Sequence, residues 1–178
     1  MRNKPTLTTK LLALGAGFLL VAMASIGLTL WVTWNLEGGA AAVNEAGRMR
    51  MQAWRLTSAV QAELPQQEVE ALISTFDQSV GLLREGDATG PRFVPWDAEV
   101  TRRYVDVEAL WSAQRPVWSG DGVERGRAAQ VAAQEFVEAI DQFVMAIELQ
   151  LSSLTALLNL FQFSMMALAI IGAVVMVY

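Results

Sequence analysis

Two long runs without a charged residue constrain the fold of this chain more than any other feature. One run extends from Leu11 to Leu36 and the other from Leu149 to Tyr178. A helix needs about 20 predominantly apolar residues to cross the hydrocarbon core of a bilayer, and each run is long enough. A cleaved signal peptide is the alternative for the first run, but signal cores are only about 7–15 residues long. We therefore expect transmembrane helices over residues 11–34 and 158–178.

The basic residues indicate how these helices are oriented. Arg2, Lys4 and Lys10 precede the first run, and basic residues that flank a span stay on the cytoplasmic side. We expect residues 1–10 to be cytoplasmic and the protein to lie in a bacterial inner membrane, with residues 35–157 in the periplasm. The chain has no cysteine, so this outer domain gains no disulfides and depends on core packing.

The outer domain has the pattern of an all-α fold. Prolines and neighbouring glycines divide it into candidate helices over 35–63, 66–85, 96–115 and 123–157. Apolar residues recur at a spacing of three and four in the third candidate helix and at a similar spacing in the fourth, which predicts one buried stripe on each. These residues are Val100, Tyr104, Val107 and Trp111, and then Val131, Phe136, Ile140, Phe143, Ile147 and Leu151. We predict an up-down-up-down four-helix bundle flanked by the two transmembrane helices, with the first and last bundle helices running directly into them.

The stretch "NEAGRMRMQAWRL", residues 44–56, brings three arginines into the first helix of an acidic domain. Arg48 and Arg55 share a face with polar residues, and Glu45 stands where it can pair with Arg48. The core stripe of this helix is predicted to contain Met49, Ala53, Leu56 and Val60. Arg50 belongs to neither face, because its neighbours one turn away are apolar or small: Val43, Ala46, Gly47 and Trp54.

This setting makes Arg50 a candidate anion site. Guanidinium is planar, permanently charged and able to bind a flat oxyanion in a two-pronged fashion. Small neighbours such as Ala46 and Gly47 would let a second copy of the chain approach, so that two Arg50 side chains meet across a two-fold axis. A surface arginine with its stem on apolar residues, or one paired within its own helix, is the alternative.

The same stretch resembles the periplasmic box of nitrate/nitrite-sensor histidine kinases of the NarX/NarQ type. The match covers Asn44, Ala46, Gly47, Arg50, Met51, Gln52, Trp54, Arg55 and Leu56. The resemblance implies that nitrate or nitrite binds between two copies of Arg50, with Gly47 beside it and with Arg55 and Met51 in the ligand-binding set. Binding would pass a helix displacement across the membrane. Arg48 and Trp54 depart from the family pattern. The layout also resembles the N-terminal domain of type IV pilus methyl-accepting chemotaxis transducers.

The chain contains no histidine or cysteine, which removes the common catalytic triads, the usual zinc sites and a phosphorylated histidine. The acidic pairs Asp97/Glu99 and Asp106/Glu108 diverge on a helix, so they predict a solvated face and no metal site. We expect no catalytic residue, no cofactor and no nucleic-acid partner.

The expected partners are a nitrate or nitrite anion, a second copy of the chain and membrane lipid. We expect the full-length protein to be a histidine kinase. Its cytoplasmic output region, which this sequence does not include, would contact a response regulator. Two alternatives remain open: the sensor part of a chemotaxis-type transducer, and a membrane-anchored bundle that binds another protein.

Overall fold

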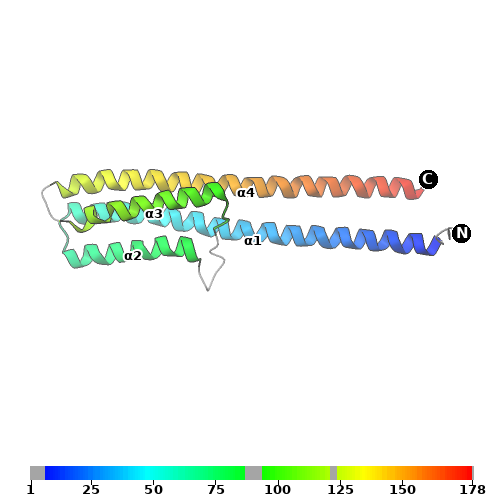
Figure 1. Cartoon of the computed structure of the whole chain (residues 1–178), viewed down its shortest axis with the longest axis horizontal. Coiled ribbons are helices and arrows are strands. Elements are labelled where there is room, and N and C mark those ends of the chain that lie inside the picture. Colours follow the sequence, from blue (N-terminus) through cyan, green and yellow to red (C-terminus); the bar gives the residue numbers. More distant parts are fainter. Residues whose placement is uncertain (1–6, 87–93, 121–123, 178) are drawn as a thin grey trace. The chain divides into compact units, whose positions relative to one another are not determined.

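The computed structural model describes residues 7–86, 94–120 and 124–177, and these form four helices without a strand (Figure 1). The helices are α1 (Leu7–Gln61), α2 (Gln66–Glu85), α3 (Ala98–Ser119) and α4 (Arg125–Val177). The prediction of an all-α fold is confirmed. The bundle parts of the first and last helices run without interruption into the apolar runs, as expected. The predicted breaks at Gly90, Pro91 and Gly122 lie outside the described residues.

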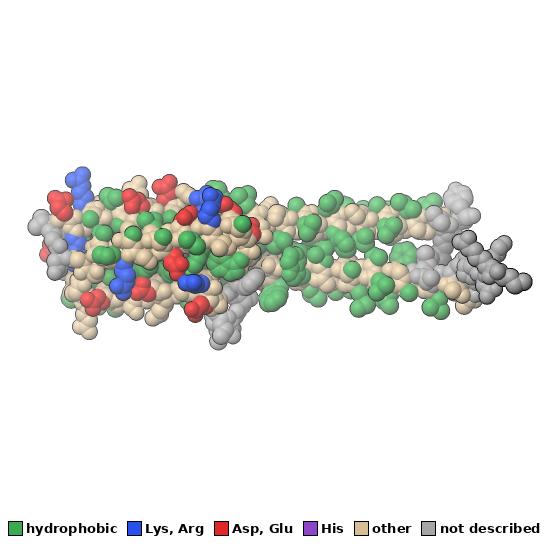
Figure 2. Space-filling view, in the orientation of Figure 1, with side chains coloured by type: hydrophobic (Ala, Val, Ile, Leu, Met, Phe, Trp, Pro, Cys, Tyr) green, Lys and Arg blue, Asp and Glu red, His purple; other side chains and the backbone are tan. Residues whose placement is uncertain are grey.

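The chain divides into two compact units, of which one is almost wholly apolar. This unit consists of Met1–Trp34 and Ser153–Tyr178, and it contains the ends of α1 and α4. Both helices are long and apolar enough to cross a membrane, with a mean hydropathy of 1.9 in their most apolar windows. Large hydrophobic side chains such as Leu20 and Phe163 are exposed along them. Figure 2 shows hydrophobic side chains over this unit, whereas the charged side chains gather on the other.

The other unit, Asn35–Ser152, is an antiparallel four-helix bundle. Hydrogen bonds join each helix to the next and the last to the first. Ser79 of α2 donates to Gln52 of α1, and Tyr104 of α3 donates to the carbonyl of Val80 of α2. Gln114 of α3 donates to Glu135 of α4, and Thr57 of α1 donates to the carbonyl of Ala129 of α4. This is the predicted up-down-up-down order.

The bundle core contains the predicted stripes of α1 and α3. Met49, Ala53, Leu56 and Val60 are buried, as are Val100, Tyr104, Val107 and Trp111. At the centre, Phe76 stacks on Trp111 with ring centroids 4.0 Å apart, and Phe136 of α4 packs against both. Burial raises the pKa of Tyr104 to about 12.

One member of the predicted α4 stripe is wrong. Val131 is 53% exposed, whereas Phe136, Ile140, Phe143 and Ile147 are buried. Five residues separate Val131 from Phe136, which is about 140° around a helix. Ala129 and Ala133 occupy the core positions instead, because they continue the spacing of three and four.

The predicted end of the third helix at residue 115 is also wrong. Pro116 lies inside α3, which continues to Ser119. A proline inside a helix removes a backbone hydrogen bond. Trp118 is buried in the core two residues later, and this apolar burial offsets the cost. The backbone N–H of Gly120 then bonds the carbonyl of Pro116 at 2.8 Å and closes the helix.

Candidate functional site

Arg50 is bonded to a carboxylate of the opposite helix. Its Nη1 donates to Oδ1 of Asp141 on α4 at a distance of 2.6 Å. The Arg50 side chain is 38% exposed and that of Asp141 is 52% exposed, so the pair lies at the edge of the bundle. The expected alternatives for Arg50 were a solvated surface charge or a pair within its own helix. The structure instead shows an ion pair between α1 and α4.

Sequence reasoning missed Asp141. The residue follows the core residue Ile140 on α4, and no local pattern marks it as a partner of α1. The antiparallel register of α1 and α4 brings the two residues together. On one side of them Gly39 of α1 lies against Leu151 of α4, and on the other Thr57 of α1 donates to the carbonyl of Ala129 of α4. Residues near 50 and 141 are therefore opposite each other. No spacing within either helix sets this register.

Gly47 lies beside the Arg50 guanidinium. A Cβ atom placed on Gly47 would be 3.6 Å from Nη2 of Arg50, which is an ordinary van der Waals contact. Two of the four expected site residues are thus brought together. The absence of a side chain at Gly47 leaves room next to the Nη2 edge of the guanidinium.

The stripe of small residues beside Arg50 is less exposed to solvent than expected. Ala46 is fully buried in the core of its own bundle, and Val43 is half-buried against that core. The expectation that Ala46 forms a free surface for a second copy is wrong, because its angular position on α1 lies next to the core residue Ala53. On this side of α1, the exposed large apolar residues are Met51 and Trp54.

Arg48 is neutralised within its own helix. Its Nη2 lies 2.6 Å from Oε1 of Glu45, whose side chain is buried. The same nitrogen donates to the hydroxyl of Ser79 on α2 at 3.3 Å. The predicted pair of Arg48 with Glu45 is confirmed, and it forms part of the polar seam between α1 and α2.

Arg55 lies away from Arg50 within one chain. The two residues are five apart, which is about 140° around the helix axis. Arg55 lines a groove of about 490 Å³ with Ser58, Ala59, Ala62, Leu64, Glu68, Ala71 and Leu72. Met51 is 69% exposed on the face between the two arginines. The structure therefore groups Arg50 with Gly47 and leaves Arg55 and Met51 outside this group.

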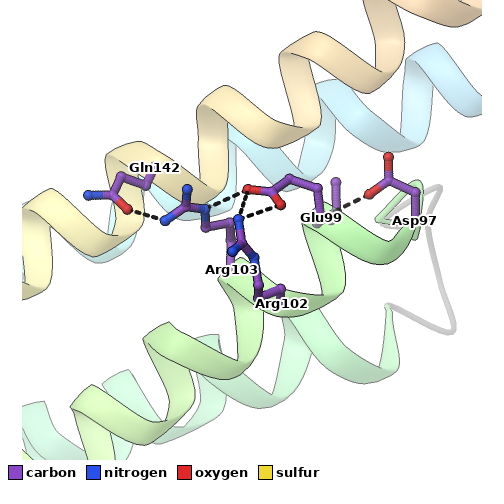
Figure 3. Close-up of polar contacts among 6 residues, drawn as sticks. Asp97, Glu99, Arg102, Arg103 and Gln142 are labelled. Carbon is purple, nitrogen blue, oxygen red and sulfur yellow. Dashed lines mark hydrogen bonds and ion pairs between the residues drawn. The ribbon is translucent and has the colours of Figure 1, made fainter.

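A second polar contact joins α4 to α3 at Gln142 (Figure 3). Nη1 of Arg103 donates to Oε1 of Gln142, the residue after Asp141. Glu99 accepts from Nε of Arg103 at 2.8 Å and from Nη2 of Arg102 at 2.6 Å. Hydrogen bonds from Arg102 and Arg103 hold the pKa of the Glu99 carboxyl below its usual value. Adjacent residues of α4 are thus bonded to α1 and to α3.

Two other residues of the predicted acidic pairs, Asp97 and Glu108, also have structural partners. Asp97 accepts a hydrogen bond from the backbone N–H of Val100 at 2.7 Å and so caps the start of the helix. Glu108 pairs with Arg84 of α2 at 3.1 Å. Among the described residues, no group of three acidic side chains is placed to hold a metal ion.

The architecture is an antiparallel bundle whose first and last helices continue into segments that are long and apolar enough to cross a membrane. Residues 31–136 match the family of type IV pili methyl-accepting chemotaxis transducer N-terminal regions, PilJ. The match covers more than half of the chain, and the chain belongs to this family. The match confirms the second resemblance seen in the sequence, to the chemotaxis transducers, whereas the resemblance to nitrate/nitrite sensors of the NarX/NarQ type stays a prediction. No curated protein matches the chain.

Proposed function

We propose that this chain is the ligand-sensing and transmembrane-signalling part of a dimeric receptor in a bacterial inner membrane, with its bundle in the periplasm. The ligand is a small planar oxyanion of the nitrate or nitrite class, held between Arg50 and the Arg50 of a second copy. The observation that carries the proposal is the position of this guanidinium. It lies half-exposed at the bundle edge, beside Gly47, and already binds a carboxylate oxygen.

The chemistry of the site favours a planar oxyanion over other ligands. Nη1 of Arg50 binds an oxygen of the Asp141 carboxylate, and Gly47 leaves room beside Nη2, so these two nitrogens form an edge that fits two oxygens of one anion. Guanidinium binds flat oxyanions in this two-pronged way. One anion can bridge two copies of Arg50 only in an arrangement that brings the two guanidinium groups together. Ligand binding therefore favours one arrangement of the two α1 helices.

The family match favours the chemotaxis-type alternative for the output. The output region would then belong to a methyl-accepting transducer, with a histidine kinase and its response regulator as the competing assignment. The input mechanism is the same in both. A displacement of α4, about 1–2 Å as in other switching helices, would be carried along a helix that is continuous from Arg125 to Val177.

The test is the effect of nitrate on the melting temperature of the full chain in lipid nanodiscs. We expect saturating nitrate, relative to chloride at equal ionic strength, to raise this temperature by about 2–8 °C, because a ligand stabilises the state that binds it. Arg50→Ala should abolish the shift. Arg84→Ala is the matched control, since it removes the exposed ion pair with Glu108 elsewhere in the bundle, and it should keep the shift.

Two results would contradict the proposal. An equal nitrate shift in Arg50→Ala and the parent would mean that the anion binds elsewhere. No shift in the parent with nitrate or nitrite would leave the bundle that binds another protein as the better assignment.

A further inference from the structure

We propose that Asp141 is a built-in competitor of the anion. Its carboxylate occupies Arg50 while the site is empty and leaves when the anion binds, so that α4 registers the occupancy of a site on α1. The inference rests on the proposed function and adds the residue that sets its affinity and carries its signal.

The first support is chemical. A carboxylate is itself a planar oxyanion, and Oδ1 of Asp141 lies 2.6 Å from Nη1 of Arg50. The open side of the guanidinium, beside Gly47, includes Nη2, and an anion that binds the Nη1–Nη2 edge with two oxygens uses the nitrogen that Asp141 already engages. It would therefore meet the bond that Asp141 already makes. Two anionic groups at one guanidinium edge also repel each other, which opposes simultaneous occupancy.

The second support is the small cost of releasing Asp141. Its side chain is 52% exposed, so water can solvate the carboxylate after it leaves Arg50. A half-exposed ion pair contributes little, about a factor of two to five in the equilibrium between paired and unpaired forms. The pair is thus strong enough to be the resting arrangement and weak enough for a small anion to displace.

The third support is the connection of α4 to its other neighbour. Gln142 accepts a hydrogen bond from Arg103 of α3, and Arg103 is held in place by Glu99 (Figure 3). Loss of the Arg50 contact leaves this second bond intact. With the site empty α4 is bonded to α1 and α3 at this level, and with the site filled it is bonded to α3 alone. The anion thereby changes which helices move together.

The test begins with nitrate titration calorimetry on the full chain in lipid nanodiscs. Asp141→Asn keeps the shape of the side chain and removes its charge. We expect it to bind nitrate about two- to fivefold more tightly than the parent, because the competing pair no longer reduces the fraction of binding-competent sites. Glu108→Gln, which breaks the exposed pair with Arg84, is the matched control and should leave the dissociation constant unchanged.

A second measurement follows α4 directly. Because the chain has no cysteine, spin labels can be attached to cysteines introduced at Asn44 of α1 and Met145 of α4, which are both exposed. The labelled chain is diluted with unlabelled chain, so that the measured distance lies within one copy. We expect nitrate to change this distance in the parent. Asp141→Asn should show the changed distance before nitrate is added.

The outcomes separate the two proposals. Equal nitrate affinity in the parent and in Asp141→Asn, with binding still lost in Arg50→Ala, overturns the role of Asp141 and leaves the anion site standing. Weaker binding in Asp141→Asn also overturns it, because Asp141 would then belong to the ligand site. Absence of nitrate binding in the parent and in Asp141→Asn overturns both proposals.

Discussion

The three arginines between Asn44 and Leu56 differ in their partners, and the partners separate their roles. Arg48 is held by the buried carboxylate of Glu45 in its own helix. Arg50 reaches across to Asp141 of α4. Arg55 is exposed beside the groove between α1 and α2. Only Arg50 combines a guanidinium beside a glycine with a bond to a helix that continues into an apolar segment.

Arg50→Lys should separate charge from shape at this site. A lysine keeps the charge and can still pair with Asp141, but it loses the planar fork that binds two oxygens of one anion. We expect nitrate affinity to fall by about tenfold or more, which is about 1.4 kcal/mol, while the melting temperature without nitrate stays near that of the parent. Calorimetry and thermal melting of the full chain in nanodiscs measure the two effects. If the lysine variant binds nitrate as tightly as the parent, two-pronged recognition is wrong.

At the scale of the elements, α1 and α4 approach closely at the base of the bundle. A Cβ atom on Gly39 would lie 2.5 Å from Cδ1 of Leu151, so the glycine is what admits the leucine side chain. On the free face of α2 the situation differs, because a Cβ atom on Gly81 would have no neighbour within 4 Å. The two glycines therefore have opposite expected responses to the same substitution.

Gly39→Ala should lower the free energy of unfolding by about 1–3 kcal/mol, the usual cost of overpacking. Leu151→Ala in the same chain should recover much of that loss, since it removes the atoms that clash. Gly81→Ala is the control and should be neutral or stabilising by up to about 1 kcal/mol. Unfolding of the four proteins in a double-mutant cycle measures the coupling. Additive effects of Gly39→Ala and Leu151→Ala would show that these helices do not meet here.

At the scale of the whole molecule, the proposed dimer needs a surface on α1. Ala46 marked this surface in the sequence together with Gly47, but it is buried in its own bundle. Met51 and Trp54 are exposed instead, and they lie on the same side of α1 as Gly47. We therefore propose that two copies meet through the face that contains Gly47, Met51 and Trp54.

A cysteine in place of Met51 should form a disulfide-linked dimer when membranes that contain the full chain are oxidised. The symmetry of a two-fold interface brings a central residue close to its own copy. Val105→Cys on α3 is the control, because Val105 is similarly exposed but lies on another helix of the bundle. Electrophoresis without reductant separates the products. Crosslinking at Val105 without crosslinking at Met51 would place the interface elsewhere.

The sequence by itself determined the fold class and most of the core. Uncharged runs and a spacing of three and four are local patterns, so they predict helices, apolar segments and buried stripes without knowledge of neighbours. The pair of Arg48 with Glu45 was predictable for the same reason, because three residues on a helix set its geometry. The error at Val131 was one of spacing, because a residue five positions before Phe136 leaves the buried stripe, whereas at Pro116 the burial of Trp118 in the core overrides the local signal.

Only the tertiary structure decided what Arg50 contacts. Asp141 is 91 residues away in the chain, and the two meet because of the register between α1 and α4. That register depends on how side chains of both helices interlock, as at Gly39 and Leu151. The burial of Ala46 follows from the same packing. A pattern within one helix identifies its faces, but it does not identify which residue of another helix lies opposite, and the candidate site depends on that pairing.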